Sequence, residues 1–368
     1  MRLSKLFSEA ELQAQMDAAM VKATPDPSGR LTILNYTKRA QFTPELWNHV
    51  TDKCRGLIVD QERNLVARAF EKFWNLNDVH HPETLMENLP ASPPVLTRKL
   101  DGSLGIGYEL DGKWRVATRG AFTSDQAVWA SQWLERSSPS VWPEGWTPLF
   151  EIVYPDNRIV VRYEYEGLVL LALVKIETGE EAAYAELVRQ GERNGVPVVE
   201  MFDRPLAECV AEDVRNEEGY VAAWPRPGTT PLRVKIKYGN YVRLHRLLTM
   251  TNAVTVWEML RDGLDVAELT TDVPDEFRSW IDGLVERFRG AYGAIEDAAG
   301  VAMEAYPGEK NNVDAERKKA FALYVLERHK ELAPILFAMI GGKRYDAIIW
   351  KMIRPRGDEE KTFKVDEA

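Results

Sequence analysis

The sequence predicts an α+β protein in which an antiparallel-sheet domain is followed by an all-helical domain. Strand-length runs of alternating apolar residues, separated by turn residues, continue to about residue 245. Beyond about residue 252, apolar residues recur at helical spacing and β-branched runs are few. A length of 368 residues also favours two domains. We therefore expect a sheet domain over residues 1–247, with a helical lead-in, and a helical domain over residues 248–368.

The expected strands share alternating or continuous apolar residues that end at turn residues. They cover residues 30–36, 57–59, 65–70, 103–110, 112–118, 150–154, 157–163, 168–176, 197–202, 217–222 and 232–239. The strongest hairpin signal is Asp111-Gly112, a dipeptide that favours a tight turn between adjacent antiparallel strands.

The expected helices share an apolar face, and some have a polar residue at the start or a glycine after the end. They cover residues 3–22, 124–135, 181–194, 206–215, 254–263, 276–292, 294–306, 313–330 and 334–340. In the second of these, Ser124 is the expected N-cap, and Val128, Ala130, Trp133 and Leu134 are expected to face inward.

Composition limits the class of protein and its compartment. No apolar run approaches the ~18 residues that a membrane span needs, and the first residues lack a signal-peptide pattern. The two cysteines argue against a disulfide framework and favour a reducing cytoplasm. Because the net charge is -10, a nucleic-acid partner would need a local basic groove rather than a basic surface.

The stretch Lys99-Leu100-Asp101-Gly102 places a lysine at the end of an expected strand, next to a tight turn. Such an amine can act as a nucleophile only if its surroundings lower its pKa from about 10.4. The simpler interpretation is a surface hairpin with a solvated lysine. Further polar residues of suitable chemistry, spaced along the expected sheet, favour the functional interpretation.

Those residues lie on or near the expected strands, and cations outnumber carboxylates six to two. They are Arg55, Lys72, Lys99, Arg119, Glu151, Glu218, Lys235 and Lys237. A polyphosphate pocket needs such an excess of cations, with carboxylates left to hold a divalent metal. Neighbouring cations are also expected to disfavour the ammonium form of Lys99. Each residue taken singly could instead be an ordinary surface charge.

The same stretches resemble a known superfamily, the covalent nucleotidyltransferases, which comprise ligases and capping enzymes. Lys99-Leu-Asp-Gly102 resembles their first motif. The later motifs follow in the right order: Thr118-Arg119-Gly120, Phe150-Glu151, Glu218-Gly219-Tyr220-Val221 and Lys235-Ile-Lys237.

Finer features are similar to the phage-type ATP-dependent RNA ligases of the T4 RNA ligase 1 class. These features are Cys54-Arg55-Gly56, Lys72-Phe73-Trp74-Asn75, Pro155-Asp-Asn157-Arg158-Ile159-Val160 and Tyr241-Val-Arg-Leu-His245. The resemblance covers about residues 30–250. It implies a cytoplasmic enzyme of a bacterial or phage-infected cell, and we expect a monomer.

The resemblance also implies a role for each residue. Lys99 would attack the α-phosphate of ATP and carry AMP to an RNA 5′-phosphate, which a 3′-hydroxyl would then join; tRNA is one candidate substrate. Arg55 and Lys72 would contact phosphates, and Lys235 and Lys237 would hold the α-phosphate. Glu151 and Glu218 would organise Mg²⁺ (or Mn²⁺). Gly102 would allow close approach of the nucleotide, and Arg119 stands where the family often has lysine.

Two alternatives remain open. A DNA ligase or a capping enzyme would share the first motif, but nothing here resembles the OB domain that follows the last motif in those enzymes. A non-catalytic RNA-binding protein could keep the scaffold, but it would not need both carboxylates. The helical domain is a candidate for RNA recognition, or it simply covers apolar surface.

Overall fold

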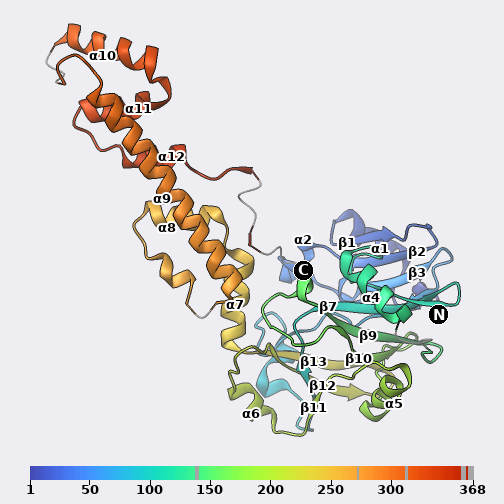
Figure 1. Cartoon of the computed structure of the whole chain (residues 1–368). Helices are drawn as coiled ribbons and strands as arrows, with labels where there is room; N and C mark the ends of the chain where they lie inside the picture. Colours follow the sequence, from blue (N-terminus) through green and yellow to red (C-terminus); the bar gives the residue numbers. More distant parts are fainter. Residues whose placement is uncertain (137–140, 272, 311–313, 358–361, 364–368) are drawn as a thin grey trace. The chain divides into compact units, whose positions relative to one another are not determined.

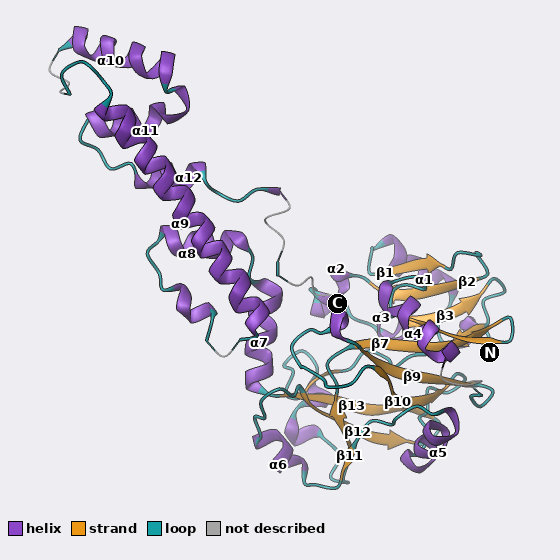
Figure 2. Ribbon diagram, in the orientation of Figure 1, coloured by secondary structure: helices purple, strands orange, loops and turns teal. Residues whose placement is uncertain are grey.

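The protein, seen here as a computed structural model, divides into two compact units, Met1–Arg243 and Leu244–Glu367. The structure describes residues 1–136, 141–271, 273–310, 314–357 and 362–363. All the strands described lie in the first unit, whereas the second is built of helices (Figures 1 and 2). The predicted fold class, antiparallel sheets followed by a helical region, is therefore confirmed.

The first sheet is antiparallel and has the strand order β1-β2-β3-β4. Its strands are β1 (Val21–Pro25), β2 (Leu31–Tyr36), β3 (Arg55–Asp60) and β4 (Leu65–Ala67). Buried aliphatic side chains of β2 and β3, such as Ile33 and Ile58, form one hydrophobic cluster with Ile106 and Leu149 of the second sheet. The first two sheets therefore share a core.

The second sheet has the order β10-β9-β7-β8 and the third has the order β11-β6-β12-β13-β5. The strands of the second sheet are β7 (Ser103–Leu110), β8 (Lys113–Ala117), β9 (Trp146–Val153) and β10 (Gly167–Lys175). Those of the third are β5 (Trp74–Asn75), β6 (Val95–Lys99), β11 (Met201–Phe202), β12 (Gly219–Arg226) and β13 (Thr229–Lys237). Only the β13–β5 pair among these is parallel.

The turn after Lys99 carries the chain from one sheet to another. Lys99 ends β6 in the third sheet, and Ser103 begins β7 in the second. Within the third sheet, Gly219 pairs with Lys99 on one side and with Lys237 on the other. Because residues directly opposite each other point to the same face, Lys99 and Lys237 share a face.

The helices of the first unit are short, and α7 carries the chain into the second unit. They are α1 (Glu9–Asp17), α2 (Lys38–Gln41), α3 (His49–Lys53), α4 (Asp125–Arg136), α5 (Tyr184–Asn194), α6 (Leu206–Ala211) and α7 (Gly239–Met250). Single 3₁₀ turns among the described residues are η1 (Leu3–Lys5), η2 (Pro44–Leu46), η3 (Pro82–Thr84), η4 (Met86–Asn88), η5 (Pro155–Asn157), η6 (Val266–Leu269) and η7 (Lys330–Leu332).

The second unit packs its helices around a core of its own. Its helices are α8 (Ala253–Arg261), α9 (Asp275–Glu304), α10 (Ala315–Arg328), α11 (Ala333–Ile340) and α12 (Asp346–Met352). Phe321, Val325, Leu336 and Ile349 are among its buried residues. No helix in the described part of the chain is long and apolar enough to cross a membrane.

Four sequence expectations are wrong in detail. The helix expected over residues 3–22 is interrupted, because a capping box between Ser8 and Glu11 starts α1 and β1 begins at Val21. The helices expected over residues 276–292 and 294–306 form one helix, α9, in which Gly293 has open space around it. A glycine inside a helix costs only about 1 kcal/mol relative to alanine, which the packing of α9 outweighs.

The other two errors concern burial and strand pairing. Val128 is 43% exposed, so it does not face the core beneath α4. Residues 157–163 form no strand, because the backbone N–H groups of Val160 and Val161 donate to the Asp101 carboxylate instead of to a neighbouring strand. Residue 313, the expected start of a helix, lies outside the described residues.

Candidate active site

The Lys99 amine lies at the centre of a buried ion-pair cluster. Lys99 Nζ donates to Glu218 Oε2 at 2.7 Å, and Lys237 Nζ lies 2.9 Å from Glu218 Oε1. The Glu218 side chain is only 3% exposed, so solvent screens these pairs little. The pairing of β6, β12 and β13 creates this cluster, because it places both lysines next to the residue that precedes β12.

The protonation state of Lys99 differs from the sequence expectation. Burial acts to lower the pKa of Lys99, but Glu218, Glu151 and Asp101 outweigh burial and raise the pKa above its usual value. The expectation that cations around Lys99 would disfavour its ammonium form is therefore wrong, because the nearest charged groups are carboxylates. Lys99 can act as a nucleophile only after its ammonium group loses a proton, which the neighbouring carboxylates oppose.

The lysine whose ammonium form is disfavoured is Lys235. Its pKa lies well below the usual value, because it is buried and because Lys72, Lys99, Arg55 and Lys237 repel its charge. Its Nζ lies 4.8 Å from the centre of the Phe73 ring. A lysine crowded by four cations has a strong electrostatic preference for a bound anion, which would restore its charge.

Glu151 is buried beneath the Lys99 turn. Gly102 N–H donates to Glu151 Oε1 at 2.8 Å. A Cβ at Gly102 would lie 2.4 Å from the carbonyl oxygen of Ile152, so this approach admits only glycine. Burial, with Glu218 and Asp101 nearby, raises the pKa of Glu151 to about 8 although Lys99 and the Gly102 N–H oppose this. A bound cation would therefore stabilise the ionised form of Glu151.

Asp101 fixes the shape of the turn, a role that the sequence analysis missed. Its Oδ1 accepts a hydrogen bond from the Tyr241 hydroxyl, and its Oδ2 accepts from the backbone N–H groups of Val160 and Val161, all at 2.7 Å. Its own N–H donates to the Tyr163 hydroxyl at 2.7 Å. Both carboxylate oxygens are engaged in this way, so Asp101 fixes the turn that follows Lys99.

A second group of cations surrounds Tyr36. Arg119 donates a hydrogen bond to the Tyr36 hydroxyl, and its guanidinium carbon lies 4.5 Å from the centre of the ring. Burial acts to raise the pKa of Tyr36, but the charges of Arg55, Arg119 and Lys72 outweigh burial and lower it. Three of the cations predicted for the nucleotide site therefore lie around this tyrosine.

Lys72 lies within an aromatic cage that the sequence analysis also missed. Its Nζ lies 5.0 Å from the ring centres of Tyr36 and Trp47 and 4.7 Å from that of Trp74. The cage attracts the ammonium through cation–π interactions, and no carboxylate of the described residues forms an ion pair with it. The available signal was the aromatic density of Lys72-Phe73-Trp74.

The structure brings the nine predicted residues together. Charge interactions link Arg55 to Glu151 and Arg119, and link Lys235 to Lys72, Lys99, Arg55 and Lys237. Among the described residues, no group of three or more His, Cys, Asp or Glu side chains could hold a metal ion. A divalent cation held by Glu151 and Glu218 would therefore need further oxygens from water or from a bound phosphate.

Comparisons with known proteins give independent information. Residues 53–221 match a family model described as RNA ligase. A putative RNA ligase from Thermovibrio ammonificans is 33% identical over 209 residues, which cover 53% of this chain and 53% of the relative. This match therefore spans about half the length of the relative.

A second relative is similar over more of its length. An RNA ligase from Rhodothermus phage RM378 is 23% identical over 391 aligned positions, which cover 85% of this chain and 83% of the relative. Among solved structures, an archaeal ATP-dependent RNA ligase (form 2) aligns with a TM-score of 0.48 at 14% identity, covering 92% of this chain and 96% of that one.

Proposed function

From the premise that residues 53–221 belong to the T4 RNA ligase 1-type family of RNA ligases, we propose that this chain is an ATP-dependent RNA ligase. The observation that carries the proposal is the buried Glu218 carboxylate, which holds Lys99 and Lys237 side by side next to Lys235. One lysine is then poised as a nucleophile, and two others are placed to bind the phosphate that it attacks.

In the first step, Lys99 Nζ attacks the α-phosphorus of ATP. A P–N bond forms, the P–O bond to the β-phosphate breaks, and pyrophosphate leaves with the electron pair of that bond. The Lys99 ammonium first gives one proton to Glu218, whose Oε2 already accepts its hydrogen bond, and the second proton that Nζ loses as the P–N bond forms leaves with pyrophosphate. Lys235 and Lys237 stabilise the negative charge that develops on the phosphate oxygens.

Two further transfers complete the reaction. An oxygen of the RNA 5′-phosphate attacks the lysine-bound AMP, and the P–N bond to Lys99 breaks as Nζ regains a proton. A 3′-hydroxyl then attacks the RNA 5′-phosphorus, forming the new phosphodiester bond and releasing AMP. Asp101 keeps Lys99 in place through the first two transfers.

A divalent cation fits this site because Glu151 is buried and its pKa is raised to about 8. Glu151 and Glu218 are the residues that would hold Mg²⁺ or Mn²⁺. When bound, the cation supplies positive charge that offsets the hold of the carboxylates on the Lys99 proton. Arg55, Lys72 and Arg119 remain to bind the outer phosphates.

The proposal is tested by incubating the full chain with ATP labelled at the α-phosphate and with Mg²⁺. We expect a label that resists denaturation, release of pyrophosphate, and circularisation of an RNA that has a 5′-phosphate and a 3′-hydroxyl. Preferential labelling by GTP would indicate a capping enzyme, and sealing of nicked DNA alone would indicate a DNA ligase. No label with any nucleotide, from folded protein, would favour a non-catalytic RNA-binding protein.

For the helical unit, we propose a role in recognising the RNA. The residues proposed for this role are basic, and all but Arg317 are exposed; they are Arg317, Lys318, Lys319, Arg328, Lys343, Arg344 and Lys351. Arg317 already pairs with Glu309, and Arg344 with Asp346, which leaves lysines as the better phosphate ligands.

We expect the triple variant Lys318→Ala, Lys319→Ala, Lys343→Ala to seal structured RNA about tenfold more weakly at low salt and with a smaller salt dependence, because each lost phosphate contact lowers the salt slope by about one. Self-adenylation should keep its wild-type rate. The matched control removes Lys22 and Lys113, which are exposed on the first unit. Equal sealing by the variant and the wild type at every salt concentration would leave the helices as scaffold.

A further inference from the structure

Residues 38–46 form a surface segment that carries the most exposed aromatic side chain of the described residues. Phe42 is 76% exposed, and no other aromatic side chain in the described ranges is more than half exposed. Leu46, four residues further on, is 42% exposed. The segment consists of α2, the connection Phe42-Thr43, and η2. Scattered single apolar residues on a surface are ordinary, but two exposed within five residues point to a binding role.

Hydrogen bonds within the segment fix its conformation, so the exposure of Phe42 is built into the fold. The Thr37 hydroxyl accepts from the N–H of Ala40 at 3.3 Å and thereby caps the start of α2. After the helix, the Thr43 hydroxyl donates to the carbonyl oxygen of Arg39 at 2.7 Å. Ala40 is completely buried and anchors α2 to the domain, while the Phe42 ring stays outside the core.

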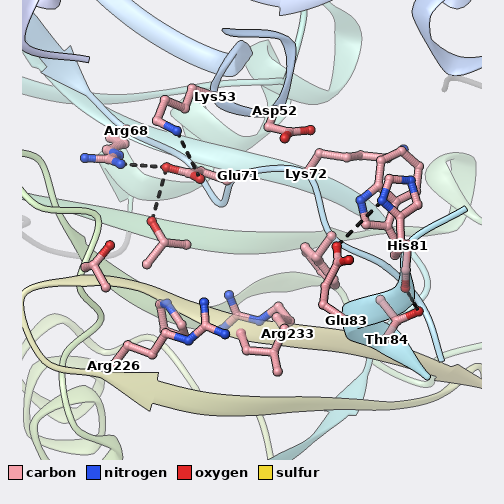
Figure 3. A pocket seen from close by; sticks show the side chains of 16 residues that line it. Asp52, Lys53, Arg68, Glu71, Lys72, His81, Glu83, Thr84, Arg226 and Arg233 are labelled. Atoms are coloured by element: carbon pink, nitrogen blue, oxygen red, sulfur yellow. Dashed lines mark hydrogen bonds and ion pairs between the residues drawn. The ribbon is translucent and has the colours of Figure 1, made fainter. Parts of the chain in front are cut away.

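Both ends of the segment are fixed in the candidate active site. Tyr36, two residues before α2, is the tyrosine around which three cations of the site lie. Trp47, the residue after η2, contacts Tyr36 with ring centres 4.9 Å apart and belongs to the cage around Lys72. Lys72 and Trp74 of that cage also line the polar cavity shown in Figure 3. Because α2 is only about one turn long, or about 5.4 Å, the segment stays close to the site.

Two basic residues of α2 accompany Phe42. Lys38 and Arg39 are exposed, and within the described residues no carboxylate forms an ion pair with either of them. The N–H of Phe42 donates to the carbonyl oxygen of Lys38 at 3.1 Å, so these two residues are one helical turn apart on the same side of α2. Glu45 is the only carboxylate in the segment. The segment is therefore locally basic on a chain whose net charge is -10.

An exposed aromatic ring beside unpaired cations matches the chemistry of an unpaired nucleotide. The face of a base stacks on an aromatic side chain, while lysine and arginine bind the phosphates next to it. Bases inside a duplex are already stacked on one another, so such a ring favours single-stranded RNA. An apolar peptide or a second copy of the chain would cover Phe42 and Leu46 but would leave the charges of Lys38 and Arg39 unmatched.

We propose that residues 38–46 form a docking surface for single-stranded RNA next to the end that is to be joined. Phe42 stacks on one base of the strand, and Lys38 and Arg39 bind the phosphates beside that base. Because Tyr36 and Trp47 fix the segment in the candidate active site, a strand docked on it has its end close to the site. This inference deepens the proposed function and rests on it for the identity of the strand.

The first test measures how a fluorescent, single-stranded RNA with a 5′-phosphate binds to the full chain in the absence of ATP. We expect Phe42→Leu to raise the Kd about 10-fold, because leucine keeps apolar surface but cannot stack on a base, and Phe42→Trp to restore binding. Replacing Lys38 and Arg39 with glutamine should weaken binding and reduce its salt dependence. The matched controls Val210→Ala on α6 and Arg193→Gln on α5 are exposed changes that should leave the Kd unchanged.

Abasic nucleotides make the test specific for stacking. When the bases near each end of the RNA are removed one at a time, the wild type should bind more weakly at the position that stacks on Phe42. Phe42→Leu should show no further loss at that position, because the two changes remove the same contact. In sealing assays, Phe42→Leu should raise the half-saturating RNA concentration, while self-adenylation, which needs no RNA, keeps its rate.

The binding measurement also separates this inference from the proposed function. A chain that binds RNA in this pattern but never reacts with ATP would refute the ligase and keep the docking surface. Equal RNA binding by the wild type and folded Phe42→Leu, or an equal loss in the two control variants, would overturn the proposal. Dimers of the wild type that Phe42→Leu abolishes without any change in RNA binding would also overturn it, and would make the segment a contact between copies of this chain.

Discussion

Replacing Lys99 with alanine is expected to reduce covalent labelling by α-phosphate-labelled ATP to background. Lys99 Nζ is held 2.7 Å from Glu218 Oε2, across β12 from Lys237 of β13. Without this amine the proposed P–N bond cannot form. Lys237 is the nearest competitor, because it shares the same carboxylate at 2.9 Å.

The experiment therefore includes Lys237→Ala beside Lys99→Ala. Lys237→Ala should label slowly, because it loses a phosphate-binding charge but keeps the nucleophile. Lys113→Ala, an exposed change at the start of β8, should label like the wild type. Sealing of RNA that already carries the adenylate should survive in Lys99→Ala, which shows that the variant is folded. Labelling that persists in Lys99→Ala and disappears in Lys237→Ala would assign the nucleophile to Lys237.

Much of the fold could be predicted because its signals are local. Asp111 and Gly112 both adopt positive φ, 56° and 69°, which is the conformation that a tight hairpin turn requires, and the two strands flank them as expected. Gly195 adopts a φ of 63° at the end of α5, where the sequence places a closing glycine. Such positions carry their own conformational preference.

The parts that could not be predicted depend on contacts between distant residues. Asp101 accepts hydrogen bonds from backbone groups 59 and 60 residues away, which turns an expected strand into a loop. The aromatic cage of Lys72 combines Tyr36, Trp47 and Trp74 from three segments. Local sequence patterns give no information about contacts between distant segments, so these residues were missed.

The raised pKa of Lys99 has the same origin. The excess of cations in the sequence suggested that Lys99 would be repelled into its neutral form. The register of β6, β12 and β13 instead places Lys99 next to Glu218. The lysine surrounded by cations is Lys235. The protonation state of a group depends on its nearest neighbours in space. Counting the charged residues of the motifs does not show which of them are neighbours.

The second large effect is expected from the two buried carboxylates. Glu218→Gln and Glu151→Gln should each slow self-adenylation by about 10³-fold, since losing a metal-organising charge is worth several kcal/mol and each 1.36 kcal/mol is tenfold in rate. Glutamine keeps the shape of each side chain, so folding should be preserved better than with alanine. Single-turnover labelling with saturating ATP and Mg²⁺ measures the effect.

Metal binding gives the same prediction a pH dependence. Because the pKa of Glu151 is raised to about 8, this carboxyl is largely protonated at lower pH, and a metal must displace its proton. The affinity for Mn²⁺ should therefore rise with pH, by up to about tenfold per unit, and level off above about pH 8. In Glu151→Gln this rise should be absent. A flat affinity between pH 6 and 8 in the wild type, or near-normal adenylation by both folded variants, would mean that Glu151 and Glu218 serve only as structural carboxylates.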